Sequence, residues 1–154
     1  MTYKEYKDQR QKEFNELPIF FAFSKDQFKK AMEERGLTEN DTDQLYGIGP
    51  GGYYLKKDAQ TIRDFMYAED PLPGLMKDPE FAEDAFYYEM ANHEYHINWQ
   101  GDWDVCQCFC DVEYNDEYSY ADYLLLGDYD DSTIEAFKKA RARFLKDCDE
   151  NGWY

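Results

Sequence analysis

Glu89, His93 and His96 are side chains able to bind a metal ion, and they occur within eight residues of the sequence. On a helix all three would project from one face, since Glu89 and His93 are four positions apart and His93 and His96 are three apart. A carboxylate and two imidazoles suit Zn²⁺ or Fe²⁺. The spacing differs from the H-E-x-x-H motif, in which the second histidine follows at four positions. A metal-dependent enzyme or metal-stabilised domain using these three residues is our alternative hypothesis, beside a structural one in which they bond one another and nearby tyrosines.

Three of the four cysteines form a C-x-C-x-C pattern at Cys106, Cys108 and Cys110. Zinc sites usually separate two cysteines by two to four residues, so this pattern favours small buried side chains over ligands. Cys106 or Cys108 could still complete a site with the residues above. No basic residue near the cysteines would lower a thiol pKa, and there is no G-x-S-x-G motif. We therefore predict no catalytic residues and no cofactor, and we favour a protein that is not an enzyme.

The strongest feature of the sequence is the stretch 78–135, which contains 17 Asp and Glu and no Lys or Arg. The rest of the chain holds 17 acids and 17 bases, so the whole formal net charge of −17 arises from this stretch. The stretch also contains 13 aromatic residues, whereas disordered acidic segments have few. It therefore predicts a folded, anionic surface.

Fourteen of these acids are expected to form a partner-binding surface. They are Glu80, Glu83, Asp84, Glu94, Asp102, Asp104, Asp111, Glu113, Asp116, Glu117, Asp122, Asp128, Asp130 and Asp131. Duplex DNA carries one charge per ~1.7 Å of its axis, so a set of 17 charges corresponds to roughly 29 Å of duplex, which fits on one face of a domain of this length. Such a surface would attract the basic groove of a nuclease, methyltransferase or repressor, and salt would weaken the attraction. We expect a basic, nucleic-acid-binding host protein as the partner, and no direct binding to nucleic acid or to a membrane.

Helices are predicted over residues 2–16, from Ser24 to Gly36, after Asp58, over about 79–96 and after Asp131. Capping-box patterns begin the first two, and apolar residues recur at helical spacing in each. The last helix carries bases that either lie against the acidic stretch or face solvent. These bases are Lys138, Lys139, Arg141, Arg143 and Lys146.

A short strand is predicted at 19–23, a hairpin at 45–55 around a Gly-Pro-Gly-Gly turn, and a further strand is possible at 111–118, where acids alternate with Val and Tyr. Together these elements predict a mostly helical α+β fold with a small antiparallel sheet, in a single domain over residues 1–154. The charged N-terminus lacks the apolar segment of a secretory signal, and no apolar run approaches the ~20 residues of a membrane span. We therefore expect a soluble, cytoplasmic protein.

Three pieces of the chain resemble a family of small uncharacterised proteins of phages and mobile elements: residues 17–24 (LPIFFAFS), 49–54 (GPGGYY) and 86–95 (FYYEMANHEY). The similarity covers most of residues 1–110. It implies an accessory role in a phage or mobile element and transfers no activity or catalytic residue. Residues 96–99 (HINW) are similar to a short piece of the acidic antirestriction proteins that mimic DNA.

The main hypothesis is therefore an accessory protein that inhibits a basic, DNA-handling host defence protein by presenting a DNA-like negative surface. A third hypothesis is a protein-interaction module with a partner unrelated to DNA. In that case exposed tyrosines would serve as anchors, since tyrosine is enriched at interface hot spots.

Overall fold

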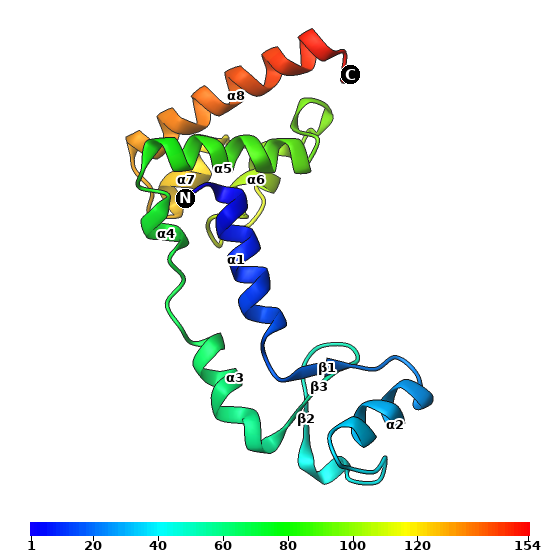
Figure 1. Ribbon diagram of the computed structural model, residues 1–154. Helices are drawn as coiled ribbons and strands as arrows, with labels where there is room; N and C mark the ends of the chain where they lie inside the picture. The colour runs from blue at the N-terminus through cyan, green and yellow to red at the C-terminus, as the bar shows by residue number, and fades with distance from the viewer. The chain divides into compact units, whose positions relative to one another are not determined.

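The computed structural model describes residues 1–154, and the chain divides into two compact units. Met1–Asp8 and Asp70–Tyr154 form one, which we call the helical unit, and Gln9–Glu69 form the other, which we call the sheet unit. Eight α-helices and three short strands make up the chain (Figure 1). The prediction of a mostly helical α+β fold with a small antiparallel sheet is confirmed, and the single domain stays a prediction.

Helix α1 (Tyr3–Asn15) begins with a capping box, as predicted. The hydroxyl of Thr2 accepts a hydrogen bond from the Glu5 backbone N–H at 3.1 Å, and the Glu5 carboxylate accepts one from the Thr2 N–H at 2.9 Å. The two bonds satisfy N–H groups that a helix start leaves without partners. Its first residues belong to the helical unit, where Tyr3 and Tyr6 are buried.

The sheet unit contains β1 (Ile19–Phe21), β2 (Leu45–Gly47) and β3 (Gly52–Leu55), all antiparallel in the order β1-β3-β2. Phe20 pairs with Tyr53 across β1 and β3, and Tyr46 pairs with Tyr54 across β2 and β3. The predicted strand at 19–23 is shorter and only partly buried. Because successive side chains of a strand point to opposite faces of the sheet, Phe20 is buried while Phe21 is 50% exposed.

The hairpin between β2 and β3 explains the glycines of residues 49–52. Gly49 and Gly51 adopt φ values of +61° and +70°, a region that glycine enters without a steric cost. A Cβ on Gly52 would lie 2.1 Å from the carbonyl oxygen of Ile48, whose N–H donates to the Gly52 carbonyl. The tight turn therefore requires glycine, as the hairpin prediction assumed.

Two helices complete the sheet unit, with 3₁₀ turns at Thr42–Gln44 and Lys56–Asp58. Helix α2 (Lys25–Glu34) is capped by Ser24, whose hydroxyl accepts a hydrogen bond from the Gln27 N–H. Helix α3 is Ala59–Met66. Met32 of α2, Ile62 of α3 and Phe20 of β1 are each buried, so each of these elements has an inward-facing side.

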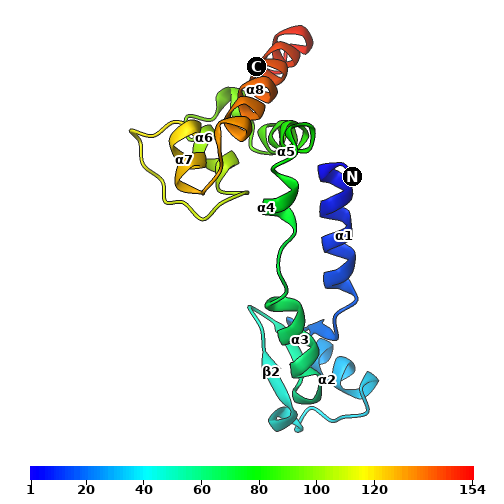
Figure 2. The same ribbon diagram turned by 90° about the vertical axis from the view of Figure 1, so that its left-hand side faces the viewer.

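The helical unit contains α4 (Leu72–Leu75), α5 (Pro79–Asn92), a 3₁₀ turn (Tyr95–Ile97), α6 (Gly101–Cys106), α7 (Tyr120–Leu126) and α8 (Asp131–Asn151). Helix α8 packs along α5, and α6 and α7 lie together beside them (Figure 2). Phe86 of α5 and Phe137 of α8 meet at the centre, with ring centroids 5.0 Å apart and no exposed surface. The residue that caps the start of α8 is Asp130, one position before the predicted Asp131: its carboxylate accepts a hydrogen bond from the Thr133 N–H.

The prediction of a further strand at 111–118 is wrong. The segment between α6 and α7 contains no strand, because side chains of the helical unit take its backbone hydrogen bonds. The indole N–H of Trp103 donates to the Val112 carbonyl at 2.9 Å. The Tyr123 hydroxyl donates to the Asn115 carbonyl at 2.7 Å and accepts from the Asn115 N–H at 3.1 Å.

None of the eight helices combines the length and apolar character that a membrane span requires.

Candidate functional site

Helix α5 ends at Asn92, before the predicted boundary at 96. Glu94 adopts the left-handed conformation with φ of +50°, which stops the helix and turns the chain. His96 therefore lies in the following 3₁₀ turn, where its Nε2 is 2.8 Å from the Trp153 carbonyl oxygen. Of the alternative metal set Glu89, His93 and His96, the structure brings together Glu89 and His93 and leaves His96 apart from them.

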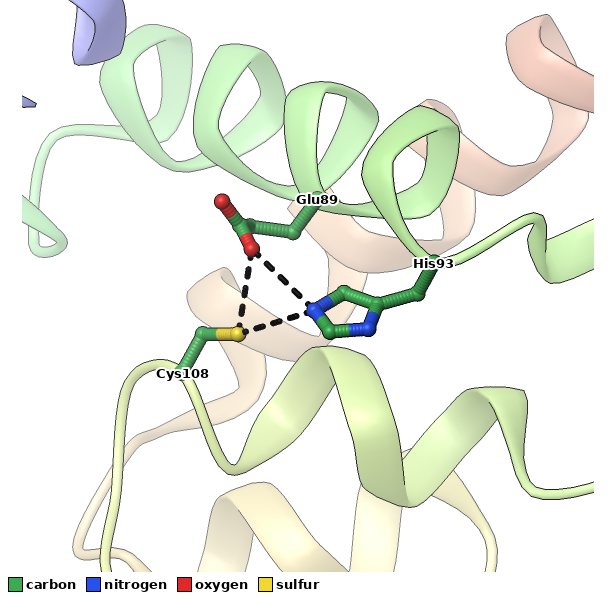
Figure 3. A group of neighbouring side chains, drawn as sticks. All are labelled: Glu89, His93 and Cys108. Atoms are coloured by element: carbon green, nitrogen blue, oxygen red, sulfur yellow. Dashed lines mark hydrogen bonds and ion pairs between the residues drawn. The ribbon is translucent and has the colours of Figure 1, made fainter.

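Cys108 takes the place that the sequence assigned to His96. Its Sγ lies 3.1 Å from Glu89 Oε2 and 3.5 Å from His93 Nε2, and His93 Nε2 is 3.4 Å from the same carboxylate oxygen. Figure 3 shows Glu89 and His93 pointing from α5 towards Cys108, which follows α6 in the chain. Three potential metal ligands of different chemistry thus converge, and we call them the Glu-His-Cys cluster.

The other oxygen of the Glu89 carboxylate binds the start of α1. Lys7 Nζ lies 3.1 Å from Glu89 Oε1, and the Tyr3 hydroxyl donates to it at 3.3 Å. Burial alone would raise the pKa of Glu89, but hydrogen bonds from Cys108 and Lys7 and the charge of Lys7 outweigh burial, so the pKa lies below its ordinary value. Glu89 is therefore an ionised carboxylate with only 2% of its surface exposed.

The surroundings of Cys108 favour its protonated thiol. Burial, together with the hydrogen bond to Glu89 and its negative charge, raises the pKa of Cys108 to about 12, so the reactive thiolate is scarce at neutral pH. A catalytic triad places the acid and the nucleophile on opposite nitrogens of the histidine ring, whereas Glu89 and Cys108 both approach Nε2 of His93. That the cysteines are not nucleophiles stays a prediction, although His93 and Lys7 bring two basic groups near Cys108 that the sequence did not indicate.

The remaining cysteines are packing residues. Cys106 and Cys148 are fully buried in the core of the helical unit. Cys110 is half-buried, and its thiol contacts the backbone carbonyls of Cys106 and Tyr123 at 3.3 and 3.8 Å. Burial raises the pKa of Cys110 to about 11. Cys106, the other candidate for completing a metal site, does not approach the cluster.

All fourteen acids of the predicted partner-binding surface lie in the helical unit, and eleven are exposed. The half-buried ones are Glu83, Asp102 and Asp104. Asp102 accepts hydrogen bonds from the Tyr95 hydroxyl and the Tyr120 N–H, and Asp104 accepts one from the Asn98 amide at 2.6 Å. The carboxylates of Asp102 and Asp104 therefore accept hydrogen bonds within the helical unit and are not free to bind a partner.

Three exposed acids also have internal partners. The Asp84 carboxylate accepts a hydrogen bond from the Tyr3 N–H, and those of Asp122 and Asp130 cap α7 and α8. The remaining acids are exposed, with no hydrogen bond or ion pair. They are Glu80, Glu94, Asp111, Glu113, Asp116, Glu117, Asp128 and Asp131.

The bases of α8 neutralise little of this charge. Arg143 pairs with Glu83 of α5 at 3.2 Å, whereas Lys138 and Lys146 pair within their own helix. The helical unit as a whole contains 23 Asp and Glu against 8 Lys and Arg, a formal net charge of −15, and the sheet unit contains 11 against 9. The negative charge is therefore concentrated in one compact unit.

The segment 111–117 carries four exposed acids, Asp111, Glu113, Asp116 and Glu117, and we call it the acidic loop. Its backbone is held by the Trp103 and Tyr123 hydrogen bonds described above. Asn115 adds a turn of its own, because its side chain accepts from the Glu117 N–H at 3.0 Å. The four carboxylates are thus displayed on an ordered backbone although no strand supports it.

A cavity of about 270 Å³ opens beside the acidic loop. Aromatic rings form much of its wall: Tyr114 packs edge-to-face against Trp99 and Trp103, with centroids 6.1 and 5.8 Å away. Trp99 is 83% exposed. Asp116 lines the cavity with no internal partner, and Arg141 also lines it, bound through its Nε to the Tyr95 hydroxyl. The cavity thus has aromatic residues, an unpaired carboxylate and one guanidinium in a lining that is mainly polar.

Sequence patterns identified Glu89, His93 and the acids, and named Cys108 as one of two candidates. They missed Lys7 and Tyr3, which lie 82 and 86 positions from Glu89. They also missed Trp103 and Tyr123 as the residues that hold the acidic loop. No local pattern signals such contacts; the only available sign was the number of aromatic residues in the acidic stretch.

Comparison with known proteins gives one match. A family model described as a family of unknown function, DUF7659, matches residues 2–107. Glu89 and His93 lie within the matched residues, whereas Cys108 and the acidic loop follow them directly. No curated protein and no solved structure matches the chain. Because the family model spans more than half of the sequence, the chain belongs to the family of unknown function DUF7659.

Proposed function

We propose that the protein binds a basic, nucleic-acid-handling protein through the anionic surface of its helical unit, and inhibits it by occupying the site where DNA would bind. The phage or mobile-element setting, in which the target would be a host defence enzyme, belongs to the same proposal and rests on the resemblance of residues 17–24, 49–54 and 86–95.

The acidic loop is the observation that carries this proposal. Four carboxylates within seven residues face solvent without a cation, on a backbone held by Trp103 and Tyr123. Like charges held close together repel, and the repulsion costs stability unless a partner supplies positive charge. An ordered backbone also means that little conformational entropy is lost when the partner binds. Both features favour a role in recognition over one in solubility alone.

The aromatic cavity beside the loop supplies the anchor for one basic side chain. A guanidinium or ammonium group gains from the face of Trp or Tyr by a cation–π interaction of about 0.5–2 kcal/mol, depending on desolvation. Trp99, which is 83% exposed, is the ring available to such a group, and Asp116 offers a carboxylate at the same cavity, whose lining also includes Arg141. An arginine from the partner is the best fit, because its planar group can stack and form a bidentate bond at once.

Inhibition assays test the proposal. A panel of purified restriction endonucleases and DNA methyltransferases would act on a labelled duplex with increasing amounts of the protein, at about 50 and 200 mM salt. We expect inhibition of at least one enzyme, overcome by excess duplex and weaker at the higher salt. The quadruple variant Asp111→Asn, Glu113→Gln, Asp116→Asn, Glu117→Gln should require at least about tenfold more protein for the same inhibition.

The matched control removes the same charge from the sheet unit: Glu33→Gln, Glu34→Gln, Glu39→Gln, Asp43→Asn, four exposed acids with no hydrogen bond or ion pair. This variant should inhibit like the wild type. Equal weakening in both quadruple variants would reduce the effect to net charge, and no inhibition of any enzyme at low salt would refute the proposal. Binding to a basic protein that does not handle DNA would favour the third hypothesis of a general interaction module.

A further inference from the structure

We propose that the Glu-His-Cys cluster is a Zn²⁺ site, with Glu89 Oε2, His93 Nε2 and Cys108 Sγ as its three protein ligands. The site is separate from the acidic loop and from the cavity beside it, and it does not depend on the function proposed above.

Two of the three distances between the ligand atoms match the edges of a zinc coordination tetrahedron, and the third is shorter. With Zn–S of about 2.3 Å and Zn–N or Zn–O of about 2.0–2.1 Å, a tetrahedral site separates sulfur from nitrogen by about 3.6 Å and nitrogen from oxygen by about 3.4 Å. The corresponding separations here are 3.5 Å and 3.4 Å, and sulfur and oxygen are 3.1 Å apart. The sulfur–oxygen edge of such a site is also about 3.6 Å, so on metal binding Cys108 Sγ and Glu89 Oε2 would move apart by about half an ångström as the S–H proton between them leaves.

The second oxygen of Glu89 has the environment expected around a ligand that binds through one atom. Lys7 and Tyr3 bind Oε1 and leave Oε2 directed at Cys108 and His93. Hydrogen bonds to the non-ligating atoms orient metal ligands and are a regular part of metal sites. Lys7 also offsets the charge of the carboxylate, so that a buried acid is tolerated on α5 before a metal binds.

The three donors point to zinc by their chemistry. A thiolate selects against the hard cations Mg²⁺ and Ca²⁺, and an imidazole and a carboxylate alongside it suit Zn²⁺. Binding forms an S–Zn bond, and the S–H proton of Cys108 passes to the solvent. His93 binds as neutral imidazole and Glu89 as carboxylate. His93 is 27% exposed and Cys108 is half-buried, so solvent reaches the site and a water molecule would be the fourth ligand.

The site would join two parts of the helical unit that lie 15 to 19 positions apart in the sequence. Glu89 lies in the last turn of α5 and His93 follows directly after the helix, whereas Cys108 lies in the turn after α6, three residues before the acidic loop. Zinc would therefore cross-link α5 to the segment from which the acidic loop emerges (Figure 3). A stabilised anchor of the loop is the expected structural consequence.

Metal titrations test the site on the full-length, reduced protein after chelator treatment. Zn²⁺ in competition with a chromophoric chelator should bind with a stoichiometry of one per chain, and Mg²⁺ should not compete. Co²⁺ in place of zinc should give a thiolate-to-cobalt charge-transfer band in the near ultraviolet. Cys108→Ser should abolish that band, and Cys108→Ser and His93→Gln should each weaken zinc binding at least about 100-fold, more than the loss of an outer partner.

Cys110→Ser and His96→Gln are the matched controls, because Cys110 is also half-buried and His96 is the residue that helical spacing selected. Both should bind zinc and cobalt like the wild type. Circular dichroism of each variant separates loss of a ligand from loss of the fold, and His93→Gln gives a second, partly exposed position if Cys108→Ser unfolds. Zinc binding absent from the wild type, unchanged in both ligand variants, or lost in Cys110→Ser but not in Cys108→Ser would overturn the assignment.

Discussion

The thiol of Cys108 donates a hydrogen bond to the carboxylate of Glu89 over 3.1 Å, although the two residues are 19 positions apart. Helical spacing selected His96 as the partner of Glu89 and His93, and the left-handed turn at Glu94 removes it. The cluster therefore draws its third member from a different element. The same carboxylate binds Lys7 and Tyr3 with its other oxygen, which makes Glu89 a junction of three segments of the helical unit.

Lys7→Met should destabilise the helical unit. Glu89 is 2% exposed, so it would remain buried without its cation, and we expect a loss of about 2–3 kcal/mol in the free energy of unfolding. Adding Glu89→Gln should recover part of the loss, because a neutral amide does not need the cation. Chemical denaturation of both single variants and the double variant measures the coupling. Lys4→Met, which breaks only the exposed pair with Asp8, serves as the control and should have no measurable effect.

Tyr123→Phe should loosen the acidic loop. The variant keeps the buried ring but removes the hydroxyl that binds both the N–H and the carbonyl of Asn115. We expect a loss of about 1–2 kcal/mol in the free energy of unfolding, and faster hydrogen exchange of the Asn115 amide. The control is Tyr118→Phe. The ring of Tyr118 packs against that of Tyr123, but its hydroxyl makes no hydrogen bond, so its removal should change neither the free energy of unfolding nor the exchange of the Asn115 amide. Unchanged Asn115 exchange in Tyr123→Phe would contradict the role assigned to its hydroxyl.

Alkaline pH should reduce the stability of the fold through Tyr129. Burial, with smaller contributions from Cys110 and Asp70, raises the pKa of this phenol to about 12, and its hydroxyl donates to the Phe109 carbonyl at 2.8 Å. Because the folded state holds the proton more tightly than the unfolded chain, the contribution is complete below the unfolded pKa of about 10 and is lost as pH rises to about 12.

Tyr129→Phe tests this linkage. At pH 8 the variant should be less stable than the wild type by about 1 kcal/mol, the contribution of one hydrogen bond. The difference should shrink as denaturation is repeated at increasing pH above about 10, since the wild type loses what the variant lacks. A difference that stays constant over this range would show that Tyr129 does not ionise with the expected pKa.

Phe137→Ala should be among the most damaging substitutions. The Phe137 ring is fully buried, stacks on Tyr120 at 4.3 Å and meets Phe86 at 5.0 Å. We expect a cost of about 3–5 kcal/mol from the lost burial and the cavity. Leu126→Ala, at a side chain that is 60% exposed, should cost less than about 0.5 kcal/mol. Similar thermal unfolding of the two variants would show that the centre of the α5–α8 contact lies elsewhere.

The sequence by itself determined what depends on neighbours along the chain. The capping box at Thr2, the hydroxyl cap at Ser24 and the glycine turn at 49–52 are local, because the interacting groups lie within a few residues of each other. The same holds for the four-residue spacing that brings Glu89 and His93 to one side of α5. The segregation of charge was also readable, since it is a property of composition.

Tertiary structure decided the rest, because the deciding contacts join residues far apart in sequence. Residues 111–118 alternate like a strand, yet Trp103 and Tyr123 take the backbone hydrogen bonds that a neighbouring strand would have taken. Lys7 reaches Glu89 across 82 positions, and no local periodicity encodes that distance. Which cysteine faces the cluster likewise depends on how the turn after α6 packs against α5, and this packing selects Cys108 over Cys106.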